Sequence, residues 1–356
     1  MKSHKSICIY SPWMMSIGGI ETHLTNTATV LAREGWTVDF CVKQSKMAPA
    51  AVANLRAAGV RYHRFPSLGF FGNLFISKSL LYSNSQGNTP PLIWKHGRAG
   101  RRGFHHCHTA CSAAERSSWT HRYINFIREG PPLVACSNQT RDNLWELNPE
   151  RQVEVLPYVT STVDEVVCVG SERTEGSQNG KMAFGFIGRL DRSKGIDLIV
   201  AASKRQDLSG ICWHVHGDGE MSAAVADAQG PTMKWHGAFD RSTPLSGIYS
   251  FLDALVLPSL HVEGSPLCLI EALSFGKPWV ASGQGGIREL ACSPEDHLIV
   301  DPRHPEQFFS AVKRLEQRLR QGLVDGARMQ EFYRKEFSCQ AVTGKWLSYL
   351  ESAASK

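Results

Sequence analysis

The chain has 356 residues, of which 42% are hydrophobic and 20% charged, and its formal net charge is +6. This length exceeds one ordinary domain and fits two domains of about 150 to 180 residues each. No run approaches the roughly 18 apolar residues of a membrane span, and the apolar run at residues 7–10 is too short for a signal-peptide core. We therefore expect a globular protein that stays in the cytoplasm.

Positive charge concentrates in the amino-terminal half. Residues 1–165 carry 18 Lys and Arg against 11 Asp and Glu, a net charge of +7, whereas residues 166–356 carry 21 against 22, a net charge of −1. This asymmetry fits an anionic partner of the first half about as well as it fits an ordinary solvated surface. The 10 cysteines have no regular spacing and several fall in apolar runs, which favours reduced, buried thiols.

The first half alternates between strand and helix patterns. The apolar run 7–10 leads to Gly18 and Gly19, where backbone N–H groups could approach a ligand closely, although these glycines do not make a dinucleotide-binding fingerprint. Residues 66–90 follow no clear pattern. The expected helices are 21–33, 48–58, 113–128 and 139–147, and the expected strands are 37–42, 61–65, 91–97, 133–137 and 153–156.

Basic and histidine side chains crowd the stretch from 95 to 111. His96 ends a strand pattern, at the edge where parallel sheets bind ligands. The side chains that follow or flank it are Lys95, Arg98, Arg101, Arg102, His105, His106, Cys107, His108 and Cys111. A metal site is disfavoured because adjacent histidines rarely converge on one ion and a Cys-x2-Cys pair is absent. The stretch is better interpreted as a flexible basic loop.

Residues 166–181 turn polar and contain Gly and Ser, which indicates a linker between domains 1–165 and 182–337. After the strand pattern 183–187, Arg189 and Lys194 straddle a turn into a helix, where two cations could clamp a diphosphate. Residues 338–356 have the spacing of a final helix. The other expected strands are 211–216, 233–236, 254–258, 279–281 and 297–300, and the expected helices are 195–205, 305–321 and 327–335.

The most informative stretch runs from Glu263 to residue 278. Ser265 is placed to cap a helix that begins at Pro266 and ends near Gly276. The helix is almost wholly apolar, so Glu271 within it needs a partner. Helix starts attract phosphate, and Glu271 would lie roughly 7 to 8 Å deeper than that anion site. Two carboxylates around a phosphate site suit a sugar nucleotide, whereas the alternative is a core helix whose carboxylate pairs with a basic neighbour.

The spacing of Glu263 and Glu271 resembles the Glu-x7-Glu motif of retaining glycosyltransferases of family 4. Gly188-Arg-Leu-x-x-x-Lys-Gly195 and Gly18-Gly-x-Glu21 are similar to two further motifs of that family. The resemblance implies the α/β GT-B fold, in which two doubly wound, Rossmann-like domains face each other across a cleft and the last helix returns to the first domain. The donor-binding residues that it implies are Gly18, Gly19, Arg189, Lys194, Glu263, Gly264, Ser265, Pro266, Leu267 and Glu271.

The resemblance also implies a reaction. A hexosyl unit would pass, with retention, from a UDP- or GDP-sugar to a saccharide acceptor in polysaccharide or lipopolysaccharide biosynthesis. Glu271 would hold the ribose, Arg189 and Lys194 the diphosphate, and Glu263 and His96 the sugar. The acceptor would be lipid-linked and handled by the basic first domain at the inner face of the cytoplasmic membrane, through Lys95, Arg98, Arg101 and Arg102. No cofactor, metal ion or nucleic acid is expected.

Two departures from the family pattern leave other activities open. The sequence Leu156-Pro-Tyr158 lacks the Asn and Gly that the family commonly has there, and residues 66–90 look abbreviated on the acceptor side. A sugar-nucleotide epimerase or a phosphorylase of the same fold is one alternative. A non-catalytic subunit that binds a nucleotide sugar is another.

Overall fold

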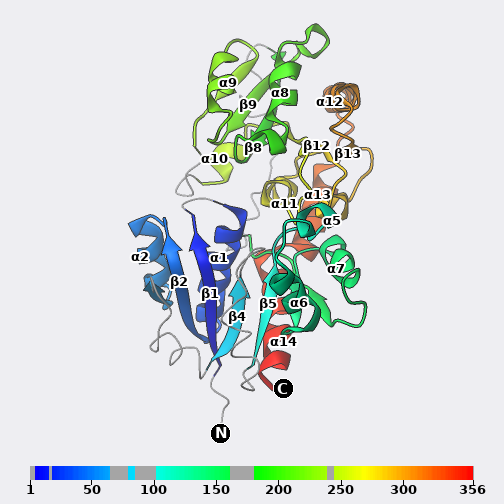
Figure 1. The fold of residues 1–356 in the computed structure, drawn as a ribbon. Helices are drawn as coiled ribbons and strands as arrows, with labels where there is room; N and C mark the ends of the chain where they lie inside the picture. Colours follow the sequence, from blue (N-terminus) through cyan, green and yellow to red (C-terminus); the bar gives the residue numbers. More distant parts are fainter. Residues whose placement is uncertain are drawn as a thin grey trace. The chain divides into compact units, whose positions relative to one another are not determined.

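The computed structural model of this chain describes residues 5–15, 18–64, 79–84, 102–160, 180–238 and 244–355. The chain divides into two compact units, shown in Figure 1. Unit 1 joins residues 1–164 to residues 337–356, and unit 2 comprises residues 165–336. Each unit contains one parallel sheet with helices packed against it. The predicted linker 166–181 lies outside the described residues except for its last two positions.

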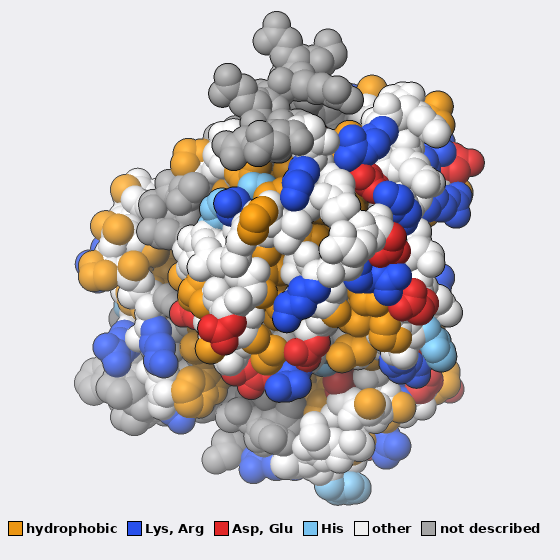
Figure 2. Space-filling view, turned by 90° about the horizontal axis from the view of Figure 1, so that it is seen from above, with side chains coloured by type: hydrophobic (Ala, Val, Ile, Leu, Met, Phe, Trp, Pro, Cys, Tyr) orange, Lys and Arg blue, Asp and Glu red, His pale blue; other side chains and the backbone are white. Residues whose placement is uncertain are grey.

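Membrane-spanning character and the mixing of charges can be judged for parts of the described surface. Across the described ranges, no helix has both the length and the apolar character to cross a membrane. On the face that Figure 2 shows, Lys and Arg side chains lie among Asp and Glu side chains, so no broad patch of one sign covers it.

Unit 1 is built on a seven-stranded parallel sheet with the order β3-β2-β1-β4-β5-β6-β7. Its strands are β1 Ser6–Met14, β2 Thr37–Ser45, β3 Arg61–Arg64, β4 Leu80–Asn84, β5 Gly103–Cys107, β6 Leu133–Ala135 and β7 Val153–Val155. Its helices are α1 Gly19–Arg33, α2 Pro49–Ala57, α5 Ala113–Arg116, α6 His121–Glu129, α7 Asn138–Trp145 and α14 Cys339–Ser355. The strand order reverses between β1 and β4, which marks the place where such sheets bind ligands at their carboxyl ends.

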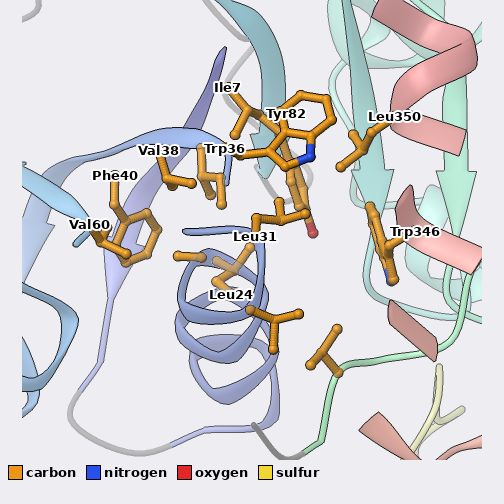
Figure 3. Close-up of a cluster of buried hydrophobic side chains, with 14 of the residues drawn as sticks. Ile7, Leu24, Leu31, Trp36, Val38, Phe40, Val60, Tyr82, Trp346 and Leu350 are labelled. Atoms are coloured by element: carbon orange, nitrogen blue, oxygen red, sulfur yellow. The ribbon is translucent and has the colours of Figure 1, made fainter. Parts of the chain in front are cut away.

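The last helix, α14, completes the core of unit 1. Leu24 and Leu31 of α1, Tyr82 of β4, and Trp346 and Leu350 of α14 belong to one buried cluster (Figure 3). The indole N–H of Trp346 also donates to the carbonyl oxygen of residue 157 at 3.0 Å. The amphipathic spacing of residues 338–352 therefore serves to cover the face of the sheet that α1 covers.

Unit 2 repeats the architecture with a six-stranded parallel sheet of order β10-β9-β8-β11-β12-β13. Its strands are β8 Met182–Ile187, β9 Ile211–His216, β10 Met233–Trp235, β11 Ala254–Leu257, β12 Trp279–Ser282 and β13 His297–Val300. Its helices are α8 Ile196–Ser203, α9 Ser222–Asp227, α10 Ser246–Tyr249, α11 Leu267–Ser274, α12 Pro305–Arg320 and α13 Gly326–Glu336, with 3-10 turns η2 Arg192–Lys194, η3 Gln206–Leu208 and η4 Gly286–Leu290. The order reverses between β8 and β11, and the prediction of two doubly wound, Rossmann-like domains is confirmed.

Two local predictions in unit 1 are wrong. The single helix expected over 113–128 is two helices, because Thr120 accepts a hydrogen bond from the N–H of Tyr123 and starts α6 afresh. The loop expected over 95–111 contains a strand, β5, whose histidines are fully buried. The many polar side chains of this stretch predict a loop, but a neutral imidazole can be buried in a strand when its nitrogens find hydrogen-bond partners. The predicted strand 91–97 lies outside the described residues.

Candidate active site

An ion pair lies at the carboxyl ends of the two central strands of unit 2. The Lys194 ammonium, from the turn after β8, lies 2.6 Å from Oε1 of Glu263, which follows β11. The Ser259 hydroxyl donates to the same oxygen at 2.6 Å. The side chains of Lys194 and Glu263 are only 18% and 9% exposed. The structure therefore brings these two predicted residues together at the point where the strand order reverses.

Backbone hydrogen bonds fasten the two loops to each other. The N–H groups of Leu260 and His261 both donate to the carbonyl oxygen of Ser193, at 2.7 and 3.1 Å. Gly195 has φ of 75°, and a Cβ atom there would lie 2.1 Å from the carbonyl oxygen of Pro258. Only glycine fits so close an approach in the left-handed region. The position of Lys194 is thus fixed by the loop that carries Glu263.

A third loop supports Glu263 from its backbone side. The N–H of Gly286 donates to the Glu263 carbonyl oxygen at 2.9 Å, and Gly285 pairs with Glu263 in an isolated parallel bridge. Gly285 has φ of 69°, and a Cβ atom there would meet the same carbonyl oxygen at 2.0 Å. Residues 283–286 lead into the 3-10 turn η4. Their support of Glu263 was not predicted.

Helix α11 differs at its start from the prediction. Ser265 does not cap it. Pro266 is the N-cap residue, in extended conformation, and no side chain closes this end with a hydrogen bond. The helix has eight residues, fewer than the eleven or so expected, and it ends before Gly276, whose φ is 63°. The first N–H groups of a helix have no partner within it, so this end keeps the donors that anion binding needs.

Glu271 lies in the middle of α11, and its carboxylate is buried. The Tyr249 hydroxyl, from α10, donates to Oε2 of Glu271 at 2.7 Å, and Tyr249 itself is fully buried. Burial raises the pKa of the Cys268 thiol to about 12, and the charges of Glu271 and Glu263 add to the effect. The phenol partner was not foreseen, because α10 lies 22 residues earlier in the chain.

Arg189, the other predicted cation, is exposed. Its side chain is 76% exposed and lies 3.5 Å from the carboxylate of Asp191. Asp191 in turn accepts from the N–H of Lys194 at 3.2 Å and so caps the turn η2. The two cations of the turn therefore differ: Lys194 is buried in an ion pair with Glu263, whereas Arg189 is exposed beside Asp191.

In unit 1, Gly18 and Gly19 lie at the start of α1, but a carboxylate already lies over them. Gly18 is the N-cap residue and Gly19 the first helical residue. A Cβ atom on Gly18 would lie 2.0 Å from Oε2 of Glu21, whose Oε1 accepts from the N–H of Met15 at 3.2 Å. Because a helix start favours only a limited negative charge, a phosphate would have to displace Glu21 there.

Most of the predicted acceptor-side cations are not among the described residues. Lys95, His96, Arg98 and Arg101 lie outside the described residues. Arg102 comes directly before β5, at the amino end of the strand, and donates to the carbonyl oxygen of Ala354 in α14. It lines a cavity of about 630 Å³ between α14 and the amino ends of β5, β6 and β7. The structure does not bring Arg102 to the carboxyl edge of the sheet.

Two clusters of histidines were not predicted from the sequence, although His106 and His108 were considered there as metal ligands. In unit 1, His23, His106 and His108 cluster beneath the carboxyl edge of the sheet. In unit 2, His214 and His236 lie 3.0 Å apart through their ring nitrogens, with His216 stacked on His236. Alternation within Ile211–His216 could have placed two of these on one face of β9. Among the residues that the structure describes, no group of three or more His, Cys, Asp or Glu could hold a metal ion.

Family models for glycosyltransferases match both halves of the chain. One described as Glycosyltransferase Family 4 matches residues 17–160, and one described as Glycosyl transferases group 1 matches residues 181–318. The 2-deoxystreptamine glucosyltransferase of Streptomyces kanamyceticus is 28% identical over 50% of this chain and 48% of its own length. The D-inositol 3-phosphate glycosyltransferase of Segniliparus rotundus is 24% identical over 86% of this chain and 79% of its own. The chain spans about half the length of the first of these relatives.

Solved glycosyltransferase structures share the fold. HepE of Anabaena, solved with UDP and glucose, matches with a TM-score of 0.75 at 15% identity, over 98% of this chain and 100% of its own. Sucrose-phosphate synthase of Thermosynechococcus elongatus matches with a TM-score of 0.72 at 18% identity, over 98% and 100%. At such identities the likeness shows the GT-B fold alone. The two family models, which match residues 17–160 and 181–318, show that this chain belongs to the family 4-like glycosyltransferases.

Proposed function

We propose that this protein transfers a hexosyl unit from a nucleoside diphosphate sugar to a saccharide acceptor, with retention at the anomeric carbon. The observation that carries the proposal is the Lys194–Glu263 pair, at 2.6 Å, with Glu271 buried on the helix that follows. A fixed cation, a helix start and two carboxylates on neighbouring elements of unit 2 match the phosphates and the two sugars of such a donor.

In the proposed mechanism each residue has a separate task. Glu271 accepts from the ribose hydroxyls. Lys194 and Arg189 neutralise the diphosphate as the glycosidic bond breaks and negative charge grows on the leaving oxygen. Glu263 accepts from hydroxyls of the transferred sugar once the donor's phosphates engage Lys194. The acceptor hydroxyl attacks from the face that the leaving group vacates and gives its proton to the departing phosphate oxygen.

The donor base and the acceptor are the finer part of the proposal. HepE of Anabaena was solved with UDP, with UDP-glucose and with UDP and glucose. These structures support UDP as the first nucleotide to test. For the acceptor we propose a lipid-linked saccharide with a diphosphate, in polysaccharide or lipopolysaccharide biosynthesis at a membrane surface. Support for this acceptor is limited to the net charge of +7 in residues 1–165.

Calorimetry with UDP, GDP and ADP tests the donor assignment first. We expect one of the three nucleoside diphosphates to bind much more tightly than the others, because they differ chiefly in the base that the site must recognise. The matching nucleotide sugar should then lose its hexose slowly to water without an acceptor. With an acceptor, NMR of the glycoside formed should show the anomeric configuration of the donor. A folded protein that binds none of the three diphosphates contradicts the proposal, and binding without any turnover points to a non-catalytic subunit.

A further inference from the structure

A cavity of about 630 Å³ lies in unit 1, beside helix α14. Its walls are one flank of α14 and the strands β5, β6 and β7, of which β7 is the edge strand of the sheet. The volume falls within the range of about 300 to 1,000 Å³ that sites for small molecules usually have. All the residues that line it belong to unit 1, so this unit forms the cavity by itself.

The cavity is elongated along α14, which runs antiparallel to the neighbouring strands. Near the start of the helix, Trp346 donates to the carbonyl oxygen of residue 157, just after β7. Near its end, the carbonyl oxygen of Ala354 accepts from Arg102, which directly precedes β5. The cavity follows residues 345–353 of α14, a length of about 12 Å at the rise of a helix. It is therefore a groove, with Arg102 at the end that lies toward the amino edge of the sheet.

Small side chains of α14 keep this groove open. The residue that packs on the core at this level is the large Trp346, whereas Ser348 and Ser352 line the flank toward β7. On a different side of the helix, Glu351 forms an ion pair with Lys5 at 2.7 Å. One side of α14 is thus tied to β1 by charged side chains, and the side toward β7 leaves space.

The lining of the groove combines charges of both signs with neutral hydroxyl groups. Arg102 and Lys345 are cations, and Glu154 on β7 is a carboxylate. Burial and the charge of Glu154 raise the pKa of Tyr349, so its phenol keeps its proton at neutral pH and lies near that carboxylate. The Tyr349 ring packs edge-to-face on Phe104, with centroids 5.1 Å apart. The phenol is therefore held in place by the core of unit 1.

This mixture of groups disfavours most classes of ligand. A lipid chain would bury the cations and the carboxylate without partners, which is costly. A polyanion would meet Glu154, and a divalent cation would find only one carboxylate among the residues that line the groove.

A neutral saccharide has the complementary chemistry. Each of its hydroxyl groups both donates and accepts a hydrogen bond, and the carbon-bound hydrogens of its ring can pack on an aromatic side chain such as Tyr349. The elongated shape of the groove fits a short chain of sugars better than a single one. We propose that this groove binds a short neutral oligosaccharide, at a site of unit 1 separate from the donor site of unit 2.

The place of the groove limits its role. Doubly wound sheets bind their reacting ligands at the carboxyl edge beside the reversal of strand order, which lies here between β1 and β4. The groove lies instead at β5 to β7 and extends to the amino edge. A sugar bound in it is therefore not the one that reacts. The inference rests on the proposed function in one respect, since a transferase that extends saccharides would use such a site to hold a distant part of the acceptor or product chain.

An array of neutral and anionic oligosaccharides, probed with the full chain in the absence of nucleotide, tests the class of ligand. We expect binding to at least one neutral oligosaccharide, and calorimetry with the best of them then gives its affinity. Binding to anionic oligosaccharides only, or to none of the array, overturns the proposal.

Blocking variants test whether that oligosaccharide lies in this groove. In Ser352→Trp an indole fills the groove, so the affinity should fall by more than about tenfold. Glu351→Trp is the matched control, because it places the same side chain where the parent residue pairs with Lys5 instead of lining the groove. Its affinity should stay within about twofold of the parent. Equal affinities of Ser352→Trp and the parent, or equal losses in the two variants, overturn the groove as the site.

Two further variants make the test independent of one substitution. Should thermal melting show that Ser352→Trp does not fold, Ser348→Trp blocks the same groove and carries the same expectation. Tyr349→Phe keeps the ring and removes one hydroxyl, so we expect the affinity to fall by about threefold to tenfold. An unchanged affinity in Tyr349→Phe contradicts the contact with the phenol.

Calorimetry with UDP on the same variants separates this inference from the proposed function. UDP affinity should be the same in Ser352→Trp and in the parent, because the groove does not belong to the donor site. A protein that binds the oligosaccharide in the groove but binds no nucleoside diphosphate would support this inference and contradict the proposed function.

Discussion

The two units of this protein share one architecture but build their polar clusters in different ways. In unit 2, Lys194, Glu263 and Glu271 come from two loops and one helix, and Glu263 and Glu271 are eight residues apart. In unit 1, the cluster around His106 is assembled from α1, β4, β5 and the segment after β7. Chemistry that is encoded in a short stretch can be read from one sequence, whereas chemistry that is assembled across a sheet cannot.

The comparison predicts that unit 1 is the more acid-labile unit. Burial lowers the pKa of four histidines in each unit, but His23, His105, His106 and His108 of unit 1 are all buried, whereas two of those in unit 2, His214 and His236, are partly exposed and the other two are His216 and His297. The pKa values of His23 and His105 are lowered to about 3 by burial, from an ordinary value near 6.5. The unfolded state therefore takes up protons first, and stability is full above about pH 6.5 and falls as the pH falls toward 3. Each histidine should cost about 1.4 kcal/mol per pH unit, so these two cost about 5 kcal/mol by pH 4.5, a large part of a domain's stability.

Urea unfolding at pH 7 and pH 4.5 measures this loss, and hydrogen exchange read on peptides of β5 and β11 shows which unit opens. We expect β5 to lose protection first. His105→Gln should reduce the dependence of the unfolding free energy on pH by about one proton. Equal protection of both strands at pH 4.5 would remove the contrast between the units.

The second largest effect concerns the cation that unit 2 holds in place. Lys194→Ala removes the fixed positive charge beside the proposed leaving group, and we expect kcat to fall by about 100-fold to 1000-fold. Arg192→Ala is the matched control, because Arg192 lies on the same turn but pairs with Asp197 at the surface, 72% exposed. Steady-state transfer rates with a UDP-sugar measure both. Similar rates in the two variants would mean that holding Lys194 beside Glu263 has no catalytic purpose.

The third largest effect is expected for Glu271→Gln, which tests whether the Glu271 carboxylate binds a ligand or only the Tyr249 hydroxyl. Glu271→Gln should weaken nucleotide binding by about 1 to 3 kcal/mol through loss of a charge-assisted hydrogen bond. Tyr249→Phe removes the 2.7 Å contact but keeps the carboxylate, so it should lower stability and change nucleotide affinity less. Calorimetry and thermal melting distinguish the two. Equal affinity in Glu271→Gln and the parent would assign Glu271 to the core of unit 2 instead.

The sequence predicted the parts of the molecule whose signals are local. Apolar runs placed the strands of unit 2 and those of unit 1 other than β4 and β5, and spacing placed Glu271 eight residues after Glu263, inside a buried helix. The same spacing could not supply the Tyr249 partner. Nor could it tell that Pro266 would be the N-cap residue, because Ser265 is the residue type that usually caps a helix and Pro266 suits the first helical position.

Where prediction failed in unit 1, long-range burial was the reason. His105 and His106 read as polar, yet β5 pairs with β4 and β6 on either side and leaves them no access to solvent. Their burial depends on the hydroxyls of Tyr123 and Tyr82 from distant segments. A pattern of residue types along one chain does not reveal whether such partners exist, so neutral histidines in a sheet are missed more readily than carboxylates in a helix.

The smallest expected effect is that of removing divalent ions. If Lys194, Arg189 and the start of α11 stabilise the leaving diphosphate by themselves, then a metal ion adds no further stabilisation of the transition state. Transfer rates in excess EDTA should therefore stay within about twofold of rates in magnesium, given that a twofold change corresponds to only about 0.4 kcal/mol. The control is Lys194→Ala in the same buffers. If the variant depends on magnesium and the parent does not, the Lys194 ammonium provides the charge stabilisation that a divalent metal ion would otherwise provide. Abolished transfer by the parent in EDTA, restored by manganese or magnesium, would instead place an essential metal in the reaction and reduce Lys194 to a partner of Glu263.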